Sequence, residues 1–204
     1  MIRVRALAFL AAIAVSTGCG SPVIPLGVSA KSHPIRVAAG TTLVLSGQSN
    51  AMYFAPFLAA AYPHEVASVV EPGKPISDWG PDRPGYTALL PLLARPVRAF
   101  VFWQGESDRH TATYLGDMQS LAARIRAANA NPILLVIEIE VLNLPQNASV
   151  RAAQEAFVRS DAHAVLVSSD SGSELGASDH LTSDGYRIVA SRVVAAVMDH
   201  QGPF

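Results

Sequence analysis

Short, almost continuous apolar runs alternate along most of this chain with longer segments of helical periodicity. The apolar runs cover residues 42–45, 66–70, 99–103, 133–139 and 164–167. Runs of this kind are typical of strands buried on both faces of a parallel sheet. Helical patterns cover residues 50–62, 86–93, 111–130, 150–160 and 183–200. The alternation predicts right-handed crossovers and an α/β fold, a three-layer α/β/α sandwich with a central, mostly parallel sheet of about five strands.

The N-terminal region has a different character. Residues 1–18 carry two arginines, then an apolar run and small residues, which is the layout of a secretion signal. Cys19 follows directly and resembles the residue at which bacterial lipoproteins are cut and acylated. We therefore expect a signal peptide at 1–18, a Pro-, Ser- and Gly-rich tether at 19–34 and one domain at 35–204. The expected location is the bacterial cell envelope, through a lipid anchor at Cys19, with a soluble periplasmic or secreted protein as the alternative.

Charge and composition narrow the classes of partner. The net charge is −1, and removal of residues 1–18 would take away two arginines and no acid, so that it would become −3. A chain with this charge lacks the excess of basic residues that would attract the phosphates of a nucleic acid. Its histidines lack metal-ligand spacing. We expect a small-molecule or glycan partner, no nucleic acid, no metal and no cofactor.

Three segments at the predicted edge of the sheet can carry chemistry. Ser49 lies in a Gly-Gln-Ser-Asn turn after an apolar run, at the carboxyl edge where parallel sheets keep their active sites. Gln104, Gly105 and Glu106 follow another run, and His180 precedes the last helix. A serine nucleophile needs a base and oxyanion donors, which these segments supply. Each alone also has a structural interpretation, as helix caps or as a solvated loop histidine.

Together the three segments resemble one family. Gly-Gln-Ser-Asn-Ala-Met at 47–52, Trp-Gln-Gly-Glu-Ser-Asp at 103–108, and His-Leu-Thr at 180–182 followed by Gly-Tyr at 185–186 are similar to the sequence blocks of the SGNH (GDSL-type) hydrolases. The resemblance is to the branch of sialate O-acetylesterases and plant-type acetylxylan esterases. It runs in order over about residues 42–197.

The resemblance implies roles for individual residues. Ser49 would be the nucleophile and His180 the base. The backbone N–H groups of Ser49 and Gly73 and the side chain of Gln104 would bind the oxyanion. Glu106 would serve as a scaffold between loops. The remaining residues assigned to oxyanion or substrate binding are Gln48 and Asn50.

The orienting acid departs from the family pattern. Family members usually place it two or three residues before the histidine, where this chain has a serine and an alanine. Asp179 is directly adjacent to His180 instead. A carboxylate at Nδ1 fixes the tautomer of the base. Three arrangements stay open: Asp179 serves after a local kink, Glu174 or Asp170 replaces it, or the site works as a Ser-His dyad.

The resemblance also implies an activity. The activity that it implies is that of a serine esterase, which would hydrolyse small acyl esters, above all O-acetyl groups on carbohydrates, through a Ser-His(-Asp) acyl-enzyme. The alternatives are a non-catalytic glycan-binding lipoprotein of the same fold and a carbohydrate O-acyltransferase. The Pro-rich segment 71–96 is expected to line the mouth of the pocket. Trp79 is a candidate for stacking on a sugar, whereas Trp103 is expected in the core.

Overall fold

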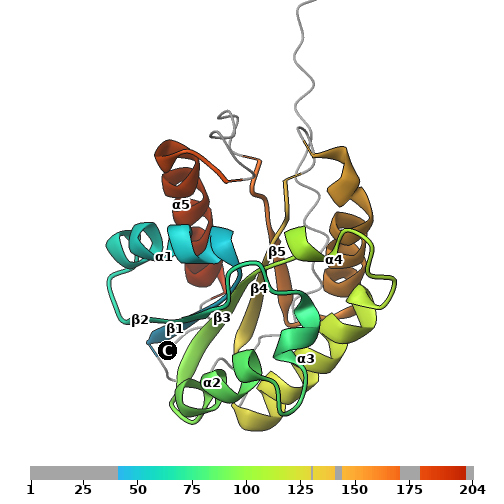
Figure 1. Cartoon of the computed structure of the whole chain (residues 1–204). Coiled ribbons are helices and arrows are strands. Elements are labelled where there is room, and N and C mark those ends of the chain that lie inside the picture. The colour runs from blue at the N-terminus through green and yellow to red at the C-terminus, as the bar shows by residue number, and fades with distance from the viewer. Residues whose placement is uncertain (1–40, 130, 141–143, 171–179, 201–204) are drawn as a thin grey trace, which may run out of the picture. The chain divides into compact units, whose positions relative to one another are not determined.

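The computed structural model describes residues 41–129, 131–140, 144–170 and 180–200 (Figure 1). The predicted signal peptide, Cys19 and the tether at 19–34 lie outside the described residues. So do two of the candidate orienting acids, Glu174 and Asp179.

One parallel sheet forms the centre of the described chain, which confirms the predicted fold class. Its strands are β1 (Thr42–Gly47), β2 (Val66–Val70), β3 (Val97–Trp103), β4 (Ile133–Ile137) and β5 (Ala164–Val167). Their order is β2-β1-β3-β4-β5, and each neighbouring pair is parallel. The direction in which strands are added reverses between β1 and β3. Ligands of open α/β sheets bind at such a switch point, outside the carboxyl ends of the strands.

Helices cover both faces of the sheet (Figure 1). The α-helices are α1 (Ser49–Ala61), α2 (Pro84–Leu93), α3 (Tyr114–Ala128), α4 (Ala148–Ser160) and α5 (Ser183–Asp199). Short 3-10 helices are η1 (Ile76–Trp79), η2 (Glu106–Asp108) and η3 (Pro145–Asn147). The helix predicted from residue 111 begins three residues later, because the N–H of Thr111 closes a turn on the carbonyl of Asp108 at 2.8 Å.

Strand pleating divides the core between the two faces. Successive side chains of a strand point to opposite sides. Leu43 and Leu45 of β1 therefore pack in the cluster that includes α1 and α5, while Val44 packs in the cluster that includes α2, α3 and α4. Complete burial of an aliphatic side chain of this size stabilises the fold by about 1.5–3 kcal/mol. Both faces of β1, β3 and β4 are buried, as their continuous apolar runs predict.

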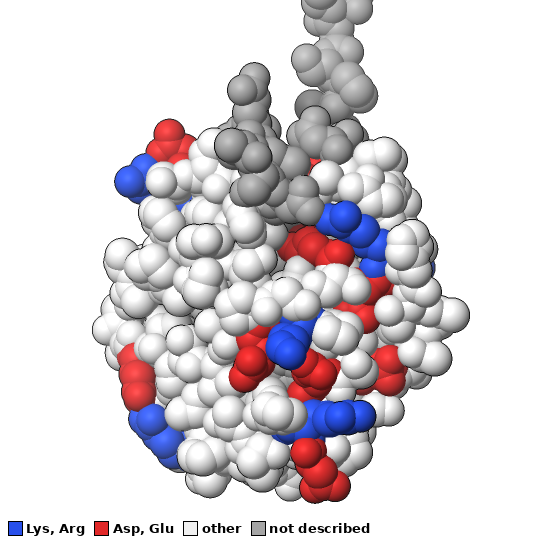
Figure 2. Space-filling view, viewed as in Figure 1, with Lys and Arg blue, Asp and Glu red and all other residues white. Residues whose placement is uncertain are grey.

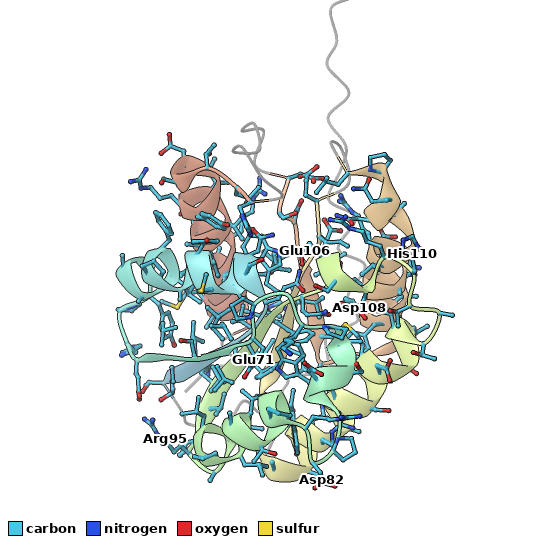
Figure 3. The ribbon with its side chains drawn as sticks, viewed as in Figure 1. Glu71, Asp82, Arg95, Glu106, Asp108 and His110 are labelled. Carbon is cyan, nitrogen blue, oxygen red and sulfur yellow. The ribbon has the colours of Figure 1, made fainter. Side chains whose placement is uncertain are left out.

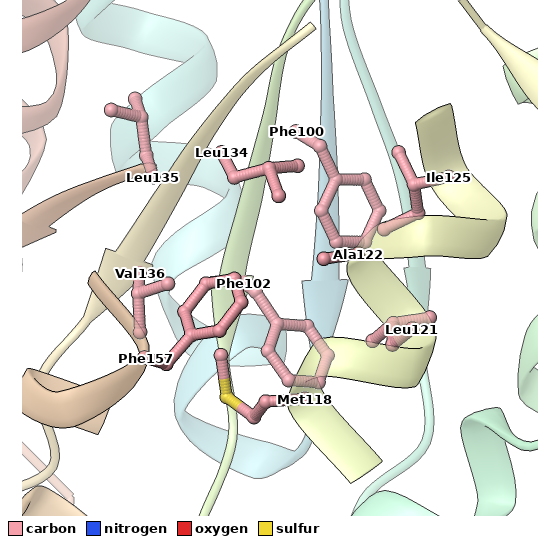
Figure 4. A pocket seen from close by; sticks show the side chains of 10 residues that line it. All are labelled: Phe100, Phe102, Met118, Leu121, Ala122, Ile125, Leu134, Leu135, Val136 and Phe157. Carbon is pink, nitrogen blue, oxygen red and sulfur yellow. The ribbon is translucent and has the colours of Figure 1, made fainter. Parts of the chain in front are cut away.

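A small gap remains in the second of these clusters. It lies between β3, β4, α3 and α4, and apolar side chains such as Phe102, Met118 and Phe157 line it (Figure 4). Its volume is about 10 Å³, which is no more than a single water requires. It is a packing gap of the core and holds no substrate.

Charges of both signs share the surface. Figure 2 shows basic and acidic side chains beside one another on the face in view. Exposed ion pairs such as Arg95 with Glu65 and Arg187 with Asp184 contribute to the mixed charge of the surface. Among the helices of the described residues, none is long and apolar enough to span a membrane.

Candidate active site

A tight turn at Gly47 presents Ser49 at the edge of the sheet. Gly47 has a φ of 142°, and a Cβ atom there would lie 1.9 Å from the carbonyl oxygen of Trp103. The next N–H, that of Gln48, donates to the same carbonyl at 3.1 Å. Glycine is required because the backbone of β3 passes so close. The chain then enters α1, whose first residue is Ser49.

His180 reaches Ser49 from the far end of the sequence. Its Nε2 lies 2.9 Å from the Oγ of Ser49, although 131 residues separate the two. Leu181 is buried beside it, and Thr182 caps α5 by accepting the N–H of Gly185 at 3.2 Å. Core packing and capping together fix the backbone that carries the imidazole.

Glu106 joins the serine turn to the loop after β3. Its carboxylate accepts hydrogen bonds from the side-chain amides of Gln48 and Asn50, the second at 2.6 Å. Figure 3 shows Glu106 beside the start of α1. The hydroxyl of Tyr186 in α5 donates to Oδ1 of Asn50 at 2.7 Å. Burial raises the pKa of Tyr186, so that it remains a neutral donor. These bonds hold both neighbours of Ser49.

The structure does not place Gln104 where the resemblance implied. Gln104 is fully buried, and its side-chain amide donates to the carboxylate of Asp108 and to the carbonyl of Lys74 at 3.2 Å. Asp108 also accepts the N–H of Ile76 at 2.9 Å. The amide of Gln104 is therefore committed to the loop that carries Gly73, and Gln104 braces that loop from below. This arrangement does not support a direct oxyanion bond from Gln104.

An open pocket of about 470 Å³ surrounds the Ser49–His180 pair. Most of the residues predicted for the site line it: Gln48, Ser49, Asn50, Gly73, Glu106 and His180. Gly73 has a φ of 72° and no heavy atom near its Cβ position, so nothing crowds a ligand there. Of the Pro-rich segment 71–96, Gly73 is the residue that reaches the pocket lining.

Sequence reasoning missed two further residues of the lining, Ser107 and Arg109. The Nε of Arg109 donates to Oδ1 of Asn147 at 3.0 Å, and Asn147 is fully buried at the start of α4. That contact holds the guanidinium stem against the pocket wall. The only signal in the sequence was that Arg109 follows Glu106 by three residues.

The candidate orienting acids divide into two groups. Asp179 and Glu174 lie outside the described residues. Asp170 follows β5, and its carboxylate is engaged by the guanidinium of Arg151 at 3.0 and 3.3 Å.

Both tryptophans belong to the core, which corrects the interpretation of Trp79 as a sugar platform. Trp79 is fully buried, and its indole N–H donates to the Oγ of Ser46 at 2.8 Å. Trp103 packs edge-on against Phe54 and is buried as expected. No group of three or more potential metal ligands occurs among the residues that the structure describes.

Comparison with protein families gives a match over most of the chain. Residues 29–199 match the family described as carbohydrate esterase, sialic acid-specific acetylesterase. No curated protein sequence matches the chain significantly.

Solved structures share the fold at low sequence identity. A protein from Arabidopsis thaliana is 17% identical with a TM-score of 0.60, over 74% of this chain and 68% of its own. A putative SGNH hydrolase from Slackia heliotrinireducens gives the same identity and TM-score, over 76% of this chain and 97% of its own. A family two carbohydrate esterase from Clostridium thermocellum, in complex with cellohexaose, is 13% identical with a TM-score of 0.62. The match covers 83% of this chain and 66% of that esterase. These similarities establish the three-layer sandwich of SGNH hydrolases.

Proposed function

Because the chain belongs to the sialic acid-specific acetylesterase family of carbohydrate esterases, and is thus a carboxylic ester hydrolase, we propose that it removes O-acetyl groups from carbohydrates through an acyl-enzyme on Ser49. The observation that carries the proposal is the 2.9 Å contact between the Oγ of Ser49 and Nε2 of His180. This is the distance at which an imidazole takes a hydroxyl proton.

In the acylation step, the Oγ of Ser49 attacks the carbonyl carbon of the ester while Nε2 of His180 takes its proton. A tetrahedral intermediate forms, with negative charge on the former carbonyl oxygen. His180 then returns the proton to the leaving alcohol oxygen as the C–O bond breaks. The products of this step are the free alcohol and an acetyl ester on Ser49.

The start of α1 supplies oxyanion stabilisation. The first N–H groups of a helix have no acceptor within the helix, and they carry the positive end of its dipole. Ser49 is the first residue of a helix of 13 residues, so its N–H belongs to this set. The N–H of Gly73 is the second donor in the proposal, since Gly73 lines the same pocket as Ser49. Each such donor contributes about 3–4 kcal/mol to transition-state stabilisation.

Deacylation repeats the same chemistry with water. His180 takes a proton from a water molecule that attacks the acetyl carbon, and the proton passes to Ser49 as acetate leaves.

A double-variant cycle tests the proposed pair. Ser49→Ala and His180→Ala should each lower kcat/KM for p-nitrophenyl acetate by at least about a thousandfold. The double variant should be no worse than either single variant, because the two side chains act as a unit. Ser191→Ala, on the exposed side of α5, is the control and should keep full activity. Additive losses, or full activity in Ser49→Ala, would refute the pair.

The fate of the acetyl group tests hydrolysis against transfer. With a sugar acceptor present, a hydrolase releases acetate at an unchanged rate and yield. A transferase would yield acetylated acceptor at the expense of acetate. Product analysis by mass spectrometry therefore decides between the proposed activity and carbohydrate O-acyl transfer.

A further inference from the structure

A second pocket opens on the other side of His180. Its volume is about 520 Å³, and α1 and the start of α5 form its walls. We call it the leaving-group groove. It is lined by Met52, Tyr53, Pro56, Phe57, Leu181 and Tyr186, together with His180 and Ser183. His180 lines both pockets, so the groove is continuous with the proposed catalytic pair.

The direction of proton transfer indicates which part of an ester lies in the groove. His180 must deliver its proton to the oxygen of the leaving alcohol, so the alcohol lies on the imidazole side of the reacting carbon. The carbonyl oxygen points the other way, toward the start of α1 and Gly73. The polar pocket therefore surrounds the acyl group, and the groove is on the side of the alcohol.

The groove combines an exposed aromatic ring with polar groups that can form hydrogen bonds. Tyr53 is 47% exposed, and its ring meets the imidazole of His180 edge-on at a centroid distance of 4.8 Å. Pro56 has no N–H, so the carbonyl of Met52 lacks the donor that the residue four positions later normally provides in a helix. The hydroxyl of Ser183 is a second polar point in the lining.

A sugar ring has the complementary chemistry. One face of a pyranose presents C–H groups that pack on an aromatic ring, and its edge presents hydroxyl groups that donate to a carbonyl. A long alkyl chain would pack on the ring of Tyr53 but would form no hydrogen bond with the hydroxyl of Ser183. A small alcohol would reach neither.

We propose that the leaving-group groove binds the sugar ring of the leaving alcohol against Tyr53, and that Tyr53 sets the preference for acetylated sugars over simple acetate esters. This inference rests on the proposed function, which it deepens. Because the alcohol departs before water attacks, Tyr53 contributes to acylation and not to deacylation.

The test keeps the acetyl group constant and changes the alcohol. The substrates are ethyl acetate, cyclohexylmethyl acetate and a panel of mono-O-acetylated methyl glucosides. The unmodified enzyme should prefer at least one glucoside over ethyl acetate by about tenfold in kcat/KM, and Tyr53→Ala should abolish that preference. Tyr53→Phe keeps the ring and should retain it. Leu90→Ala, an exposed apolar residue of α2, is the matched control.

The deacylation rate separates the proposal from a structural role of Tyr53. Pre-steady-state hydrolysis of p-nitrophenyl acetate reports the breakdown of the common acetyl-enzyme. An unchanged breakdown rate in Tyr53→Ala supports the proposal. Equal losses for all esters and for acetyl-enzyme breakdown would show that Tyr53 only positions His180, and would overturn it.

Other occupants of the groove give different results, and each would overturn the proposal. A preference for butyrate over acetate esters that Tyr53→Ala removes would assign the groove to the acyl chain. A change in sedimentation with unaltered kinetics would assign it to a second copy of the chain. The absence of any glucoside preference in the unmodified enzyme would also refute it. Absence of hydrolysis of every ester would instead refute the proposed function.

Discussion

Replacement of Glu106 by alanine tests the brace that holds the serine turn. The carboxylate of Glu106 accepts hydrogen bonds from the side-chain amides of Gln48 and Asn50, two residues that are only 2% and 5% exposed. Without it, two buried amide donors lose their acceptor at a cost of about 1–3 kcal/mol each. The free energy of unfolding should therefore fall by about 2–6 kcal/mol. Because Ser49 lies between these two residues, loss of its position should lower kcat about a hundredfold.

Urea unfolding and p-nitrophenyl acetate kinetics measure the two effects. Glu106→Gln keeps one acceptor oxygen and should give intermediate losses in both. Glu155→Ala is the matched control, because Glu155 forms solvent-accessible i,i+4 ion pairs within α4 and its removal should cost less than about 0.5 kcal/mol. A Glu106→Ala protein as stable and active as this control would refute the reasoning.

Three further predictions concern other parts of the chain. Gly47→Ala should lower the unfolding temperature sharply and abolish activity, since its Cβ would overlap the carbonyl of Trp103; a stable, active variant would contradict this. Burial alone would raise the pKa of Asp161, but hydrogen bonds from Arg126 and the N–H of His163, with the Arg126 charge, lower it. The ionised Asp161 therefore stabilises the fold above its unfolded-state pKa, and this stabilisation is lost as the pH falls through its folded-state pKa. Urea unfolding should show that Asp161→Asn destabilises the protein at about pH 6 and much less at about pH 3. Cys19→Ala should abolish incorporation of labelled palmitate and release the protein from the membrane fraction; retained label would refute acylation at this residue.

Strands β1, β3 and β4 could be predicted from sequence because both of their faces are buried, which makes their sequences almost continuously apolar. β2 and β5 are only partly buried, but they also read as short apolar runs. The predicted strands at 66–70 and 164–167 have the same first and last residues as β2 and β5. The first residues of helices could be predicted less accurately from the sequence. Thr111 and Tyr114 differ little in helix propensity. Residue 111 instead closes a turn on the carbonyl of Asp108, and α3 begins only at Tyr114.

The approach of Ser49 and His180 could be predicted because parallel strands bring their carboxyl ends to one edge. The direction of a side chain at that edge could not. Gln104 follows β3 as expected, yet Asp108 and the Lys74 carbonyl draw its amide below the pocket. Arg109 enters the pocket wall through a contact with Asn147, 38 residues later, which no local pattern reports.

The central claim is that Ser49 is a nucleophile activated by His180. Intact-mass and peptide mass spectrometry after treatment with a serine-directed phosphonate tests it most directly. The account predicts one adduct, on Ser49, that is absent in Ser49→Ala and forms far more slowly in His180→Ala. A folded, unlabelled protein, or an adduct on another residue, would contradict it.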